Sequence, residues 1–199
     1  MSNTPRARRT QAERRAESRK AVLDAATELF SRQGYAETSL EDIAERCGLT
    51  IRPIYHYFGN KKALFAAVNE QMEQRILDSM DVGGGSSEEG LKESWRAFLA
   101  LCDDPAFRQI VLIDSPNVLG RERWTDSPVM RRARSGSASG TSTASAGGFR
   151  KAFYSRVLMA ALAEAALLVA EADDLPMAKE EAEKVLLSLM SGLAAGSND

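Results

Sequence analysis

Cysteine and histidine are almost absent from this chain of 199 residues, which contains two cysteines and one histidine. Cys47 and Cys102 are too few for a disulfide framework and too far apart for a metal knuckle. The single imidazole, His56, has no Cys or His partners at metal-site spacing. We therefore predict neither a metal site nor a cofactor. Cys47 falls on an apolar helical face, which favours a small buried thiol.

Long apolar runs are also missing. The longest, residues 157–170, is too short to cross a bilayer and contains Glu164. Residues 1–20 are basic, lack the apolar stretch of a secretory signal, and have no large apolar side chain besides Met1. A helix that binds a membrane surface needs such side chains. We therefore expect a cytoplasmic protein without a membrane partner.

Recognisable enzymatic motifs are lacking as well. Residues 136–140 have the glycine spacing of an esterase motif, but Ala138 stands where the nucleophilic serine is required. The glycine-rich residues 83–87 lack the Gly-Lys-Ser/Thr ending of a phosphate-binding loop and are typical of a hinge. These absences favour a protein that is not an enzyme.

The composition that is present favours an all-α fold, because Ala, Leu, Glu and Arg are abundant and β-branched residues are sparse. The charge is uneven. Residues 1–62 carry 12 Lys and Arg against 8 Asp and Glu, whereas residues 63–199 carry 14 against 20. The basic arm at the start attracts nucleic acid or an anionic membrane surface, although a solvated, disordered tail explains it equally well.

Helical periodicity and helix-ending signals divide the basic part into three helices. The first covers residues 13–33 and ends at Gly34. Ser39 and Asp42 form the capping-box pattern that opens the second helix. Only residues 48–50 separate the second helix from the third. Two helices joined by such a short, glycine-containing turn form a helix-turn-helix.

The third helix begins at Thr50, a favourable N-cap, and has Pro53 in its first turn. Ile54 belongs to the face that packs back on the core. Asn60 then caps a long helix at residues 61–80, which is followed by a glycine-rich linker at residues 81–87.

Two short helices and two long ones are predicted after the linker. Asp104 and Ser115 each precede a proline, as expected of N-cap residues, and the second of these short helices runs toward Trp124. The chain ends with two apolar helices, at residues 149–172 and 177–193.

A low-complexity segment at residues 135–148 interrupts the predicted helices and is too poor in apolar residues to bury anything. Three explanations are open for the wider region of residues 127–155. It is a native flexible loop, a lid over a ligand pocket, or a stretch translated out of frame. Long unstructured loops are uncommon inside compact domains.

The helix-turn-helix region resembles the tetracycline-repressor (TetR) family. The resemblance rests on TSLEDIAERCGLTIRPIYHYF at residues 38–58 and NKKALF at residues 60–65, preceded by AATELF at residues 25–30. It implies an all-α homodimer of about nine helices per subunit, with an N-terminal helix-turn-helix domain and a C-terminal helical bundle. The predicted parts are a basic disordered arm at residues 1–14, a DNA-binding domain at 15–62, and a ligand-binding and dimerisation domain at 63–199.

The resemblance also implies the partners: a double-stranded DNA operator, a second copy of the chain, and an unidentified small-molecule effector. Arg52 is placed to contact a guanine edge or a phosphate. Lys61 and the hydroxyl of Ser39 are placed to hold phosphates, although Ser39 also serves as a cap. Repression is the usual action of the family, and activation remains open. The predicted DNA-binding residues are Thr38, Ser39, Thr50, Arg52, Pro53, Tyr55, His56, Tyr57 and Lys61.

Apolar residues of the C-terminal domain divide into two predicted sets. The first set could line a ligand pocket, although core packing explains each member equally well. It comprises Trp95, Phe98, Leu99, Phe107, Ile110, Trp124 and Phe153. The second set forms stripes on the last two helices, which a four-helix interface between two-fold related subunits would cover. It comprises Val157, Ala161, Leu162, Leu168, Val185, Leu186, Leu189, Met190 and Leu193.

Overall fold

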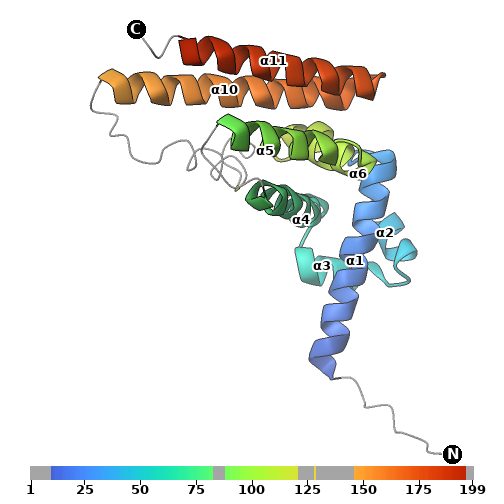
Figure 1. Ribbon diagram of the computed structural model, residues 1–199. Coiled ribbons are helices and arrows are strands. Elements are labelled where there is room, and N and C mark those ends of the chain that lie inside the picture. The colour runs from blue at the N-terminus through green and yellow to red at the C-terminus, as the bar shows by residue number, and fades with distance from the viewer. Residues whose placement is uncertain (1–9, 83–87, 121–127, 129–145, 196–199) are drawn as a thin grey trace, which may run out of the picture. The chain divides into compact units, whose positions relative to one another are not determined.

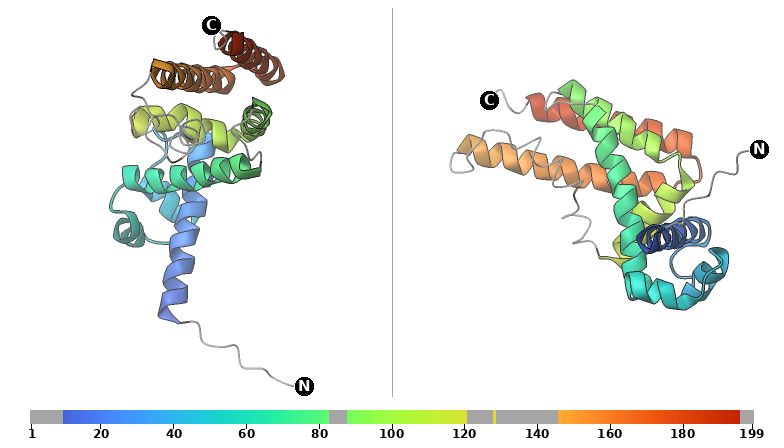
Figure 2. Two further views of the ribbon diagram at one scale, coloured as in Figure 1. Left: turned by 60° about the vertical axis from the view of Figure 1, so that its left-hand side comes forward. Right: turned by 90° about the horizontal axis from the view of Figure 1, so that it is seen from below.

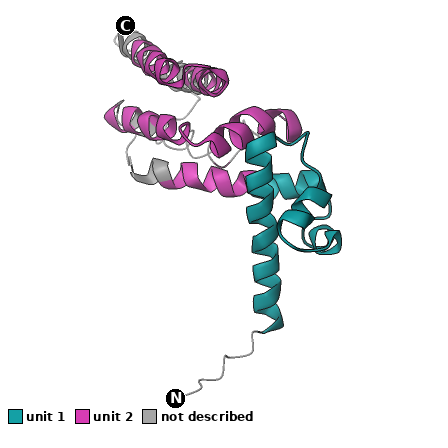
Figure 3. Ribbon diagram, turned by 90° about the vertical axis from the view of Figure 1, so that its right-hand side faces the viewer, with its two compact units in different colours: residues 1–68 teal, residues 69–199 magenta. Residues whose placement is uncertain are grey.

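The structure, a computed structural model, describes residues 10–82, 88–120, 128 and 146–195 (Figure 1). All regular secondary structure in these ranges is helical, as predicted. The chain separates into two compact units, residues 1–68 and 69–199 (Figure 3). The boundary falls inside one helix, six residues after the predicted domain boundary that follows residue 62, because the start of that helix packs with the first unit.

Helix α1 (Gln11–Gln33) begins two residues earlier than the apolar periodicity predicts. Thr10 is its N-cap: the Glu13 N–H donates to the Thr10 hydroxyl (3.2 Å), and the Thr10 N–H donates to the Glu13 carboxylate (2.7 Å). This reciprocal pair of hydrogen bonds starts the helix before its apolar periodicity begins. Residues 11–14 are therefore helical, which corrects their assignment to the basic arm. Residues 1–9 of that arm lie outside the described residues.

Helices α2 (Leu40–Arg46) and α3 (Ile51–Phe58) form the predicted helix-turn-helix. The capping box of Ser39 and Asp42 is confirmed, with N–H to oxygen distances of 2.9 and 3.0 Å. Thr50 occupies the N-cap of α3, but its side chain makes no capping hydrogen bond. Cys47 is half-buried rather than buried, because it follows the last turn of α2.

The core of the first unit is built around an aromatic cluster. Phe30 of α1 lies 5.8 Å from Tyr35 and 5.2 Å from Phe65, and Tyr35 lies 5.0 Å from Phe65, between ring centres. Phe65 comes from the start of α4 (Lys61–Val82), which Asn60 caps by accepting from the Ala63 N–H. The cluster therefore fixes the loop after α1 and the start of α4 around the helix-turn-helix. Ile43, Ile54, Leu64 and Val22 are also fully buried.

Helix α4 continues to Val82, so residues 81–82 of the predicted linker are helical, and residues 83–87 lie outside the described residues. Helix α5 (Glu88–Leu101) follows. Asp104 caps α6 (Pro105–Phe107) by accepting from the Ala106 N–H at 2.9 Å, as predicted.

The second predicted short helix has a different start and end. Helix α6 continues into a π-helix, η1 (Arg108–Asp114), and then into α7 (Ser115–Val118). Ser115 is therefore a buried helical residue and not an N-cap. A proline inside a helix removes a hydrogen bond and crowds the preceding turn. The wide π turn ends at Asp114, two residues before Pro116, where that disturbance falls. Trp124 lies outside the described residues.

The last two helices, α10 (Ala146–Glu171) and α11 (Leu175–Ala195), lie next to each other (Figure 2). Each starts a few residues before its predicted start. Residues 146–148 of the predicted low-complexity loop are thus helical, and residues 135–145 lie outside the described residues.

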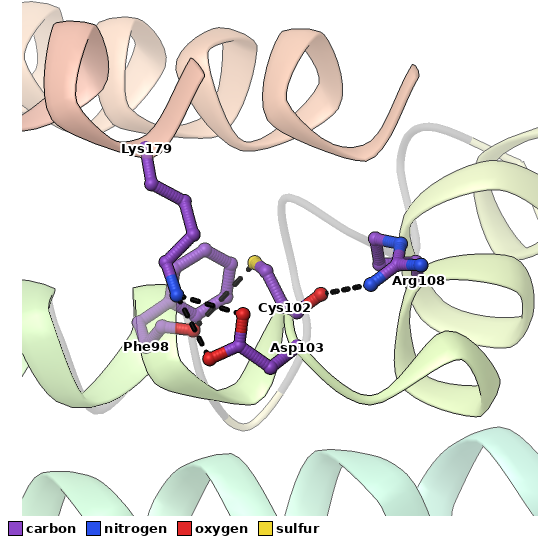
Figure 4. A network of polar contacts seen from close by, with 5 residues as sticks. All are labelled: Phe98, Cys102, Asp103, Arg108 and Lys179. Atoms are coloured by element: carbon purple, nitrogen blue, oxygen red, sulfur yellow. Dashed lines mark hydrogen bonds and ion pairs between the residues drawn. The ribbon is translucent and has the colours of Figure 1, made fainter. Parts of the chain in front are cut away.

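Ion pairs join α11 to α5 and the turn after it. Lys179 donates to Asp103 at 2.8 and 2.9 Å (Figure 4). Arg96 contacts Glu183 at 2.7 Å. Beside them the Cys102 thiol donates to the Phe98 carbonyl, and burial raises the pKa of this thiol to about 11. Exposed pairs of this kind contribute little to stability because water screens them, so they orient α11 more than they stabilise it.

None of the described helices combines the length and the apolar character that crossing a membrane requires. Within the same residues, no three His, Cys, Asp or Glu side chains are grouped so that they could hold a metal ion.

Candidate nucleic-acid interface

The outer face of α3 carries polar and charged side chains because Ile54 anchors the opposite face. Ile54 is fully buried, whereas Arg52, Tyr55 and His56 are exposed. Residues three and four apart on a helix are neighbours, so these three side chains form one surface. A helix with an apolar inner face and this outer face can present hydrogen-bond donors to base edges in a major groove. Pro53 and Tyr57 lie half-buried at its sides.

A hollow of about 470 Å³ lies beside this face and brings together four of the predicted DNA-binding residues. Thr38 and Ser39 line it from the residues before α2, Tyr55 from α3, and Lys61 from the start of α4. Glu37 and Glu41 line it as well, so the cationic charge of Lys61 is partly balanced there.

Two residues that line this hollow, Ser39 and Lys61, favour the ionised form of the Asp42 carboxyl. Hydrogen bonds from the side chain and backbone of Ser39 lower the pKa of Asp42, and the charge of Lys61 adds to the effect. The ionised carboxylate accepts from the start of α2 and so holds Ser39 in its capping position. Ser39 therefore acts as the N-cap of α2 in this structure.

Thr38 lies beneath the surface that the other candidates form. Its side chain is only 1% exposed, and its hydroxyl donates to the Gly34 carbonyl at 2.8 Å. The sequence placed Thr38 on the DNA side, but the structure uses it to close the turn after α1. Thr50, by contrast, is exposed, and its hydroxyl makes no capping bond.

Two arginines of α1 extend the site and were missed by the sequence analysis. Arg15 contacts His56 at 2.7 Å, from the guanidinium nitrogen to Nε2, and Arg19 lies 5.1 Å from the centre of the Phe58 ring. Arg15, Arg19 and His56 share a second hollow of about 390 Å³ with Tyr57. Both arginines lie on the first predicted helix, but no local pattern in the sequence indicates that they meet α3.

The predicted pocket residues of the second unit mostly belong to its core. Trp95, Leu99, Phe107 and Ile110 are buried, and Phe98 stacks on Trp95 at 5.4 Å between ring centres. Phe153 is 56% exposed on α10. Trp124 lies outside the described residues.

The predicted dimer residues divide between surface and core. Val157, Leu168 and Val185 are large apolar side chains that are about half exposed or more. Leu186, in contrast, is 1% exposed and packs within its own chain, which corrects its assignment to the interface surface. Ala161, Leu162 and Leu189 are half-buried, and the side chains of Met190 and Leu193 lie outside the described residues.

Comparison with known protein families is decisive. The family described as bacterial regulatory proteins, tetR family, matches residues 22–68, and the tetracyclin repressor-like C-terminal domain matches residues 88–193, more than half of the chain. The chain belongs to the TetR family. This TetR-family helix-turn-helix protein is therefore a transcriptional regulator, as the sequence resemblance predicts.

Curated relatives of this TetR-family regulator match it over parts of their length. The HTH-type transcriptional regulator AcrR of Shigella flexneri is 43% identical over 70 residues, which are 35% of this chain and 32% of that protein. The HTH-type transcriptional regulator AlkX of Mycobacterium tuberculosis is 26% identical over 125 residues, 60% of this chain and 59% of that protein. The chain thus spans less than two thirds of the length of each.

Solved structures match the TetR-family regulator over most of its length. A TetR-family transcriptional regulator from Pectobacterium atrosepticum is 28% identical with a TM-score of 0.63, covering 93% of this chain and 97% of that one. NalD of Pseudomonas aeruginosa, described as the secondary repressor of the MexAB-OprM multidrug efflux pump, is 22% identical with a TM-score of 0.63. That match covers 89% of this chain and 96% of NalD, and it bears on the fold alone.

Proposed function

We propose that this TetR-family regulator binds a pseudo-palindromic DNA operator as a homodimer and acts as a repressor that a small-molecule effector releases. The observation that carries the proposal is the exposed trio of Arg52, Tyr55 and His56 on α3, flanked by Lys61 at the start of α4. Bases are read by such donors in the major groove, and phosphates are held by cations beside it.

Dimerisation is supported by the apolar side chains that α10 and α11 leave exposed. Val157 and Leu168 are 11 residues apart, which is close to three helical turns, so they lie on one face of α10. A two-fold axis that pairs this face with its copy removes the apolar surface from water. Two recognition helices then read half-sites a whole number of DNA turns apart.

An effector site in the second unit is supported by two buried polar atoms. Among the described residues, the indole nitrogen of Trp95 and the amide oxygen of Asn69 are buried and have no hydrogen-bond partner. An unmade buried hydrogen bond is costly, and a polar ligand that accepts from one group or donates to the other would remove that cost. Repression itself rests on the usual action of the family.

The test is footprinting of the full chain on the DNA that flanks its own gene, with and without candidate ligands. We expect protection of two half-sites related by two-fold symmetry and loss of protection when the effector is added. Protection that is independent of sequence, or equally strong binding by a deletion variant lacking residues 39–58, would contradict the proposal.

A further inference from the structure

The contact between Arg15 and His56 constrains the chemistry of the only imidazole in the chain. The guanidinium nitrogen lies 2.7 Å from Nε2, and both residues are exposed in the first unit. A guanidinium has hydrogen-bond donors only, so Nε2 must accept. An imidazole that accepts at Nε2 is neutral and carries its proton on Nδ1.

Neighbouring contacts hold this part of α1 against α3. Arg19, one turn after Arg15, lies over the Phe58 ring of α3 at 5.1 Å, a cation–π distance. Ala12 and Ala16 line the same hollow as His56, and their small side chains leave room for the arginine to reach across. The imidazole also lies 5.6 Å from the Tyr57 ring. Arg15 therefore meets His56 from a helix that is itself fixed to α3.

We propose that Arg15 is a positioning residue that fixes His56 as the Nδ1–H tautomer, so that His56 offers DNA a hydrogen-bond donor and no acceptor. This inference rests on the proposed DNA-binding function. In the major groove a lone donor suits guanine N7 and O6, adenine N7 or thymine O4 and is mismatched with the cytosine amino group. Arg15 would thus set base preference at one position without contacting that base itself.

The tautomer can be measured directly because the chain has one histidine. In protein with ¹⁵N-labelled histidine at a pH of about 8, we expect a protonated Nδ1 and an unprotonated Nε2. In the Arg15→Met variant, His56 should revert to the Nε2–H tautomer that free histidine favours in water. Arg14→Met, an exposed arginine one residue earlier that does not line the hollow, should leave the signals unchanged. An Nε2–H tautomer in the wild-type protein would overturn the proposal.

Base preference supplies the second measurement. Binding is measured on a panel of operators that differ by single base changes. The base that His56 reads is the one at which His56→Ala no longer distinguishes these operators. There Arg15→Met should lower discrimination by roughly fivefold to tenfold, and Arg14→Met should preserve it. In the His56→Ala background, Arg15→Met should change no base preference.

Uniform weakening of all sequences by Arg15→Met would mean a phosphate contact only and would overturn the proposal. Absence of any specific operator binding by the wild-type chain would instead overturn the proposed function, and the base-reading role with it. The tautomer measurement needs no DNA, so it distinguishes these two failures.

Discussion

The ammonium nitrogen of Lys61 lies 4.3 Å from the centre of the Tyr35 ring and donates to the Ala36 carbonyl at 3.3 Å. The face of the Tyr35 ring attracts the ammonium group of Lys61. The Ala36 carbonyl accepts one of the three ammonium protons. Lys61 is thereby held at the edge of the hollow that Ser39 and Tyr55 also line, with donors left for a phosphate.

The first prediction follows from this arrangement. Lys61→Ala should weaken binding to all DNA sequences by a similar factor and reduce the slope of log affinity against log salt by about one. Fluorescence anisotropy at several salt concentrations measures both quantities. The neighbouring exposed Lys62, which does not line the hollow, provides the control, and equal effects of Lys61→Ala and Lys62→Ala would contradict a positioned phosphate contact.

Arg52 should behave in the opposite way if it reads a base. We expect Arg52→Ala to cost roughly 1–3 kcal/mol on the cognate operator and to relax specificity at one base pair. Arg32→Ala is the matched control, because Arg32 is also an exposed arginine but lies in the last turn of α1. A uniform loss on cognate and random DNA would show that Arg52 contacts a phosphate instead.

The two N-caps of the helix-turn-helix allow a stability comparison. Ser39→Ala removes a side chain that accepts from the Asp42 N–H, and caps of this kind are worth about 1 kcal/mol. It also removes a hydrogen bond that lowers the pKa of Asp42, so that pKa should rise toward its ordinary value. Thr50→Ala should cost much less, because Thr50 caps α3 without a side-chain bond. Urea unfolding and NMR titration of Asp42 measure the two effects.

Cys102 should resist thiol reagents in the folded protein. Burial raises the pKa of this thiol to about 11, so the reactive thiolate stays scarce until the pH approaches that value. The half-buried Cys47 is the internal comparison. We expect a Cys47→Ser variant to react with a disulfide reagent at pH 8 only as fast as the protein opens, and at full speed in denaturant. Rapid labelling of the folded variant would contradict the buried position of Cys102.

A feature of the fold or of the candidate site could be predicted where the residues that determine it lie close together in the sequence. The capping box at Ser39, the short turn and the apolar spacing around Ile54 lie close together in sequence, and they were sufficient for the helix-turn-helix and its outer face. The contact between Arg15 and His56 joins residues 41 apart, and no local pattern indicates such a pairing. The burial of Thr38 was missed for a related reason, because a threonine hydroxyl can donate either to a DNA phosphate or to a backbone carbonyl of the turn.

The C-terminal unit was less predictable from sequence. An apolar stripe shows which residues avoid water but not whether their own chain or a second copy covers them. Leu186 and Val185 are adjacent in the same predicted stripe, yet Leu186 is 1% exposed and Val185 is 50% exposed. Leu186 is buried and Val185 is exposed because of the way α11 packs against α10 and α5, which the sequence alone does not reveal.

That difference leads to the last prediction, which concerns assembly. Leu168 is 63% exposed on α10, so Leu168→Glu should leave each chain folded and place two charges against each other across a two-fold interface. We expect this variant to become monomeric at micromolar concentration in light scattering and to lose specific operator binding.

Leu186→Ala should instead lower the free energy of unfolding by about 2–5 kcal/mol, because it leaves a cavity in the core of the unit. Glu171, which is already exposed and charged near the end of α10, offers the control Glu171→Gln, which should change neither property. A Leu168→Glu protein that stays dimeric would place the subunit interface elsewhere on the chain.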